Sequence, residues 1–145
     1  MRPEAFGIAL AVFTITTAVG APLPSTGKFI FSDACESGGG DFEGHRMTLT
    51  RSSRGLAVFA EFNDQGPDGQ DTARDVKFDA VSGKLSFSFH GSSYGKFVFH
   101  GSVDADKLEG LLQILDDSEV PPREVGHAVL RLPAVKTVPK YLPGC

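Results

Sequence analysis

Short segments in which apolar and polar residues alternate run through most of this 145-residue chain, and they limit its fold more than any other feature. A β-strand places successive side chains on opposite faces, so alternation gives it one apolar and one polar face. Residues typical of turns, chiefly glycine, serine and proline, separate the segments. The pattern predicts strands over residues 28–33, 45–51, 56–62, 75–78, 84–90, 96–100, 108–115 and 124–132.

Segment 108–115 also fits a helix. Its leucines recur at helical spacing, and Asp106 with Glu109 resembles a capping box. Gly110 in the middle of the segment would cost a helix about 1 kcal/mol relative to alanine. Because every neighbouring segment is a predicted strand joined by a short turn, we favour a strand and keep the helix as the alternative.

About eight strands joined mostly by hairpin-length turns predict an all-β fold. Such an antiparallel meander closes best as a small up-and-down barrel or a flattened sandwich, because closure removes exposed strand edges. In strand count, length and order, this gross plan resembles the small secreted β-barrels of the lipocalin and avidin type. The chain has no tryptophan, so the tryptophan-bearing signatures of both families are absent.

The beginning of the chain has the features of a secretory signal peptide. Arg2 provides a positive end, residues 5–19 are apolar and uncharged, and Ala18 and Gly20 are the small residues that a signal peptidase recognises. We expect cleavage after Gly20; one residue later, a proline would adjoin the cut. The apolar run is shorter than the about 20 residues of a spanning helix. We therefore expect an exported protein, periplasmic or extracellular, that meets the membrane only through its signal peptide.

The two cysteines, Cys35 and Cys145, are expected to form a disulfide in an oxidising compartment. The chain-entropy model gives such a long loop about 4–5 kcal/mol of stabilisation. The bond would tether the end of the chain to the region after the first strand. The expected organisation is a cleaved signal peptide (1–20), an extended leader (21–27), a single β domain (28–132) and a C-terminal tail tethered by Cys145 (133–145).

Phenylalanines form a ladder on two neighbouring predicted strands. If residue i opposes residue 186 − i, Phe89 faces Phe97 and Phe87 faces Phe99. Such cross-strand aromatic pairs contribute up to about 1 kcal/mol each. The four rings, with Leu85, predict either the lining of a cavity for a small apolar ligand or a core filled by its own side chains.

Residues 91–95 match the G-x-S-x-G pattern of a hydrolase nucleophile elbow, with Ser93 in the nucleophile position. That motif requires a strand-to-helix turn, whereas a strand is predicted here, so a β-turn is the favoured interpretation. A small hydrolase that uses Ser93 and a histidine is kept as an unlikely alternative, and no catalytic residue is assigned.

One long acidic loop offers weak candidates for calcium binding. Counted from Asp64, aspartates stand at positions 1, 5 and 12, as in an EF-hand loop, but Gly66 replaces the oxygen donor at position 3. The candidate ligands are Asp64, Asp68, Asp71 and Asp75.

The histidines predict no metal site. In the ladder register His90 opposes Lys96 and His100 opposes Ser86, which separates the two imidazoles by about 13 Å. His127 shares its strand parity with both apolar and charged residues, so its direction is open.

The formal net charge of −4, with dispersed lysine and arginine, argues against nucleic-acid binding, which needs a clustered basic patch. No cofactor is expected. We expect a non-enzymatic binding module for a small apolar ligand or for an envelope or extracellular protein. One alternative is a periplasmic inhibitor of an enzyme such as lysozyme or a protease, which would use the loops at 36–44, 63–74, 91–95 and 116–123.

Mass spectrometry of the protein recovered from the exported fraction tests the cleavage and the disulfide together. The expected mass is that of a chain beginning at Ala21 and lacking the two hydrogens that a disulfide removes. An adduct of small-molecule mass would support the ligand-binding version. A mass that retains residues 1–20 would contradict the signal peptide.

Overall fold

The computed structural model describes residues 20–36, 42–62, 71–91 and 95–136 of this chain, and all regular secondary structure in them is β-strand. The first antiparallel sheet has the order β1 (Gly27–Ser32), β4 (His45–Ser52), β5 (Gly55–Phe62) and β6 (Asp71–Thr72). The second has the order β11 (Arg123–Pro133), β10 (Lys107–Asp116), β9 (Gly95–Val103), β8 (Lys84–Gly91) and β7 (Arg74–Phe78). Two-residue strands β2 (Cys35–Glu36) and β3 (Phe42–Glu43) pair beside them.

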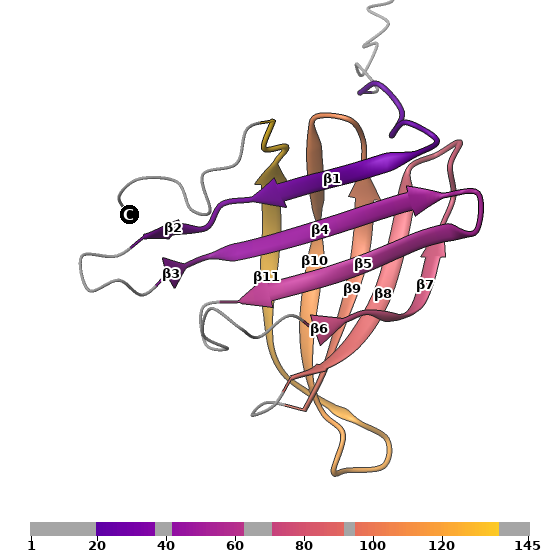
Figure 1. Ribbon diagram of the computed structural model, residues 1–145. Coiled ribbons are helices and arrows are strands. Elements are labelled where there is room, and N and C mark those ends of the chain that lie inside the picture. Colours follow the sequence, from indigo (N-terminus) through magenta and orange to yellow (C-terminus); the bar gives the residue numbers. More distant parts are fainter. Residues whose placement is uncertain (1–19, 37–41, 63–70, 92–94, 137–145) are drawn as a thin grey trace, which may run out of the picture.

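The two sheets cross at a steep angle and pack face to face (Figure 1). Every second residue of the long strands points between them, as the alternation in the sequence predicts. These inward residues form a single hydrophobic core. Its largest fully buried side chains are Phe31, Phe87, Phe89, Phe99, Met47, Leu49, Leu85, Leu108, Leu130, Leu132 and Val58.

The strands do not close into a barrel within the described residues, so the up-and-down form of the prediction is wrong. Among the described residues, backbone bonds join the edges of the two sheets at two corners. At one, β6 and β7 follow each other but belong to different sheets, and Ala73 N donates to Val58 O at 2.9 Å. At the other, a single bridge joins Phe31 to Ala134.

A β-bulge in β7 follows directly after the first corner. Asp75 has a positive φ of 53°, and the pairing of β7 with β8 shifts register between Arg74 and Lys77. Such a bulge turns a strand away from its neighbour. The chain leaves the first sheet after the two residues of β6, passes Ala73 and continues along the edge of the second sheet, where this bulge lies. The resulting fold is all-β, with two antiparallel sheets in place of a continuous cylinder.

Segment 108–115 is a strand, β10, and the helix alternative is wrong. It pairs with β9 on one side and with β11 on the other. Gly110 opposes Gly101, and a Cβ on Gly110 would lie 2.5 Å from His100 O and 2.6 Å from the Phe99 ring. The glycine that argued against a helix thus makes room for a core phenylalanine.

The leader residues pack against the β domain. Leu23 is only 4% exposed and belongs to the core. The Arg51 guanidinium donates to Leu23 O at 2.5 Å and to Pro24 O at 3.1 Å. Ala105 N donates to Ala21 O at 2.9 Å. Residues 1–19, which include most of the predicted signal peptide, and Cys145 lie outside the described residues, so the Cys35–Cys145 disulfide stays a prediction.

Truncation of a core ring tests the importance of this packing. Phe99 is completely buried, and Phe99→Ala is expected to lower the free energy of unfolding by about 3–5 kcal/mol, because it removes apolar contact and leaves a cavity. Val81→Ala is the control, since Val81 is 94% exposed and its truncation should change stability by less than about 0.5 kcal/mol. Equal urea midpoints for the two variants would contradict the assigned core.

Candidate binding surface

The phenylalanine ladder forms in the predicted register. Phe89 opposes Phe97 and Phe87 opposes Phe99. In each pair the rings stack with their centroids 4.9 Å apart. Phe62 from the facing sheet stacks on Phe89 at 5.1 Å and on Phe97 at 5.6 Å.

These rings occupy the space in which an internal ligand was predicted. The four ladder phenylalanines and Leu85 are all 6% exposed or less. Because rings from both sheets contact one another, a ligand could enter only by separating them. A ligand-lining role for the five residues stays a prediction, and the packing favours the filled core.

The outer face of the five-stranded sheet is apolar where it approaches the free edge of β11. Leu111 of β10 lies directly opposite Val129 of β11. Leu111 is 37% exposed, Val129 is 67% exposed and Val125 is 54% exposed. We call these three residues the β11 strip. His127 stands between the two valines with its side chain 61% exposed, so its open direction is settled as outward.

β11 is also an edge strand. It pairs with β10 along one side, and its other side has no strand partner in the described part of the chain beyond the bridge at Ala134. An unpaired edge presents backbone N–H and C=O groups that can pair with another extended segment. Exposed apolar side chains beside such an edge are typical of an interaction site.

The outer face is different over β7, β8 and β9, where it carries a basic depression. Two adjoining hollows, of about 510 and 160 Å³, share Lys77, Ser86 and His100 in their lining. The larger hollow also includes Lys84, and the smaller includes Lys96. We call this depression the β8 groove.

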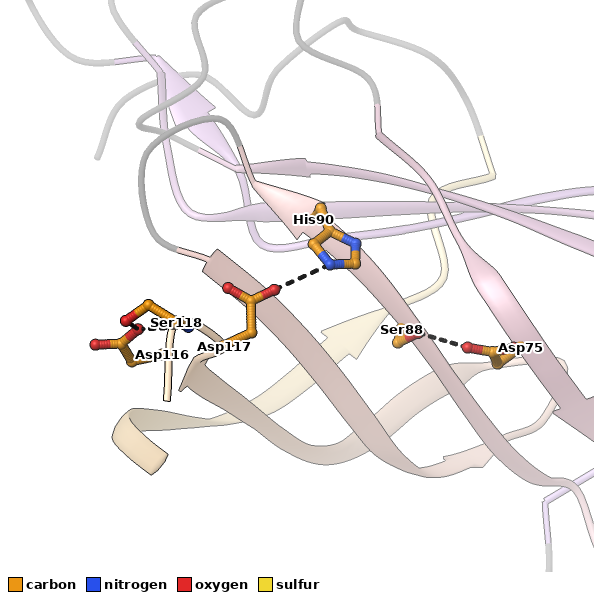
Figure 2. Close-up of polar contacts among 6 residues, drawn as sticks. All are labelled: Asp75, Ser88, His90, Asp116, Asp117 and Ser118. Atoms are coloured by element: carbon orange, nitrogen blue, oxygen red, sulfur yellow. Dashed lines mark hydrogen bonds and ion pairs between the residues drawn. The ribbon is translucent and has the colours of Figure 1, made fainter. Parts of the chain in front are cut away.

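Polar contacts order the end of the sheet beside this groove (Figure 2). His90 Nε2 and Asp117 Oδ2 lie 3.1 Å apart, and Ser88 donates to Asp75 at 3.1 Å. Ser118 Oγ donates to Asp116 at 2.6 Å, and this bond is the main reason why the pKa of Asp116 is lowered.

The chemistry predicted for the loops falls largely outside the described residues. Ser93, the predicted nucleophile position, lies there. Asp64 and Asp68 lie there as well, and Asp75 already accepts from Ser88. Among the described residues, no group of three or more histidine, cysteine, aspartate or glutamate side chains could hold a metal ion. Of the four predicted contact loops, only 116–123 is described throughout.

The predicted positions of two histidines are confirmed, since His90 opposes Lys96 and His100 opposes Ser86. The sequence analysis did not predict that the residues around His100 form a groove. Lys84, Ser86 and Ser88 occupy the polar positions that alternate with the buried ladder, so the sequence already placed them together on the outer face. The position of Lys77 beside Ser86 could not be foreseen, because it depends on the bulge in β7.

The described residues contain no helix that is long and apolar enough to cross a membrane. No protein-family model matches the chain, and comparisons with curated proteins and with solved structures found no significant match.

Acid stability tests the turn contacts at the ends of this surface. Asp79 has a lowered pKa, chiefly because the Ser82 hydroxyl donates to it at 2.8 Å. A carboxyl with a lowered pKa stabilises the fold above its ordinary value of 3.8, and the contribution is lost as the pH falls through the folded-state pKa. We expect Ser82→Ala to lower the urea midpoint at about pH 7, and the difference from wild type to shrink towards about pH 2.

Ser102→Ala is the matched control for this measurement, because Ser102 is exposed on the same sheet and makes no side-chain hydrogen bond within the described residues. Its effect should not depend on pH. A pH-independent effect of Ser82→Ala would contradict the role given to the Asp79 turn.

Proposed function

We propose that this chain is an exported, non-enzymatic binding protein that docks a partner protein on the β11 strip and the free edge of β11. The observation that carries the proposal is the exposure of Val125 and Val129 on an eleven-residue strand whose outer edge has no strand partner among the described residues. Apolar side chains and open backbone groups on one edge favour a partner that supplies both.

An extended segment of the partner fits these two features together. Its backbone would continue the β11 ladder, which supplies affinity in strand-addition complexes, and its alternate side chains would lie over the outer face. Leu111 and Val129 would contact an apolar side chain of that segment. The contact would remove exposed apolar surface from water at about 25 cal/mol per Å².

The charges along β11 favour a partner segment that is acidic. Arg123 and Arg131 lie on this strand and are exposed. Arg123 is paired with Glu119 and His127 contacts Glu124, so Arg131 is the cation of the strand for which the described residues show no ion pair. Acidic side chains that alternate with apolar ones would meet both kinds of group on the strand. Electrostatic complementarity of this kind chiefly raises the association rate and the specificity.

The same charges argue against a second copy of the chain in the best apolar register. An antiparallel pairing that sets Val125 opposite Val129 of the other copy also sets Arg123 opposite Arg131. Like charges directly opposite each other destabilise a strand pair. A heterologous acidic segment avoids this conflict.

The other predicted functions have less support. An internal apolar ligand must compete with the stacked rings of Phe62, Phe89 and Phe97. A hydrolase needs a nucleophile held by a scaffold, and Ser93 lies outside the described residues. An inhibitor of an enzyme such as lysozyme or a protease is a special case of the proposal, in which the partner protein is the enzyme.

Capture from the exported fraction with matched variants tests the proposal. Val129→Glu places a charge on the β11 strip and should reduce capture of the partner at least about tenfold. Val81→Glu is the control, because Val81 is 94% exposed on the β7–β8 turn and should leave capture unchanged. The captured protein is then identified by mass, and amide hydrogen exchange is compared with and without it.

Protection concentrated in β11 would support the proposal. Equal capture by both variants, or protection elsewhere, would overturn it. Light scattering of the chain alone tests whether a second copy of the chain occupies the β11 strip. A dimer that Val129→Glu converts to monomer would replace the partner protein with a second copy.

A further inference from the structure

The β8 groove is a second feature of the outer face, separate from the β11 strip and independent of the function proposed for it. The pairing of the strands sets its shape. Ser86 lies directly opposite Lys77 on one side and opposite His100 on the other. Facing side chains in such a row start about 4.5–5.5 Å apart. The small serine between two long side chains therefore leaves a hollow.

Further donors surround this row. Lys84 precedes Ser86 by two residues on the same face of β8, a separation of about 7 Å along the strand. It lines the larger hollow together with Lys77 and His100. Lys96 lines the smaller hollow, next to Ser88. The groove thus brings three ammonium groups, an imidazole and the Ser86 hydroxyl to one strip of surface, together with the carboxylates of Asp79 and Asp75.

The ammonium groups of the groove form no close ion pair with a carboxylate of the described residues, although Lys84 is near enough to Asp79 to help lower its pKa. No ion pair within 4.0 Å involves Lys77, Lys84 or Lys96 in the described part of the chain, whereas Lys107 and Arg123 on the same sheet are paired. This difference leaves the groove lysines able to bind an external anion.

Two aspartates also line the groove, Asp79 in the larger hollow and Asp75 in the smaller, and each accepts hydrogen bonds from the protein. Asp79 accepts from the Ser82 hydroxyl at 2.8 Å and from Val81 N at 2.9 Å, within its own turn. Asp75 accepts from Ser88 at 3.1 Å. Their carboxylates therefore use hydrogen-bonding capacity within the protein, while the lysines around them keep theirs.

We propose that the β8 groove binds the tetrahedral oxyanion of a small ligand, a phosphate or sulfate group, held by Lys77, Lys84 and His100 over Ser86. Lysine ammonium and serine hydroxyl groups are donors to such an anion, and charge-assisted hydrogen bonds are the stronger ones. A hollow of about 510 Å³ has room for a ligand larger than the anion itself.

Titration of the exported chain with inorganic phosphate tests this site by amide chemical shifts. Saturable shifts are expected at Ser86 and His100. The apparent Kd should rise at least about tenfold in a Lys77→Gln/Lys84→Gln variant, which loses two charge-assisted donors. Lys28→Gln/Lys136→Gln is the control, because it removes the same charge from lysines that do not line the groove.

A second variant separates shape from charge. Ser86→Val fills the floor of the groove without altering any charge, and it should weaken phosphate binding by a similar factor. Sulfate should bind like phosphate, and acetate at equal ionic strength should bind more weakly. Shifts that do not saturate, equal losses in the two double-lysine variants, or equal binding of acetate would overturn the proposal. None of these results depends on a partner protein at β11.

Discussion

The contact on which the rest of the structure depends is the stack of phenylalanine rings between the two sheets. Phe62 of one sheet lies against Phe89 and Phe97 of the other, and Phe87 stacks on Phe99 beside them. The described strands do not close into a barrel, so continuous backbone pairing does not hold the two sheets together. Side-chain packing between the sheets holds them together instead. The large apolar area of each ring makes this possible without tryptophan.

The same stack determines what the outer surface can display. Once Phe87 and Phe89 point inward, Ser86 and Ser88 must point outward, since the side-chain period of a strand is two. The pairing with β9 then sets His100 beside Ser86. The basic groove is therefore a consequence of core packing. A shift of one residue in the register would turn the serines towards the core and the rings towards the outer face, so the core and the groove constrain the register together.

Sequence alone could predict the parts of this fold that depend on local pattern. The hairpin register of β8 and β9, the hairpin of β4 and β5, and strand β10 all follow from alternation and short turns. The break between the two sheets could not be predicted, because it depends on how the chain turns the corner at Ala73. The position of Lys77 in the groove depends on the bulge in β7, and the burial of Leu23 depends on a tertiary contact with Arg51.

The interior is filled by side chains, and the edge of β11 is open in the described chain. Both features favour binding on the outer surface of the two sheets. In a hollow barrel the inner face would be available to a ligand and the edges would be sealed; here the rings take the inner volume, and β11 keeps an unpaired side in the described chain. The bulge beside Val125 and the arginines of β11 are features that limit indiscriminate edge pairing. They do not cover Val129, which is 67% exposed. The arginines on this edge disfavour pairing with a second copy of the chain, but no large group of the described residues covers the edge. A partner segment of opposite charge can therefore bind there.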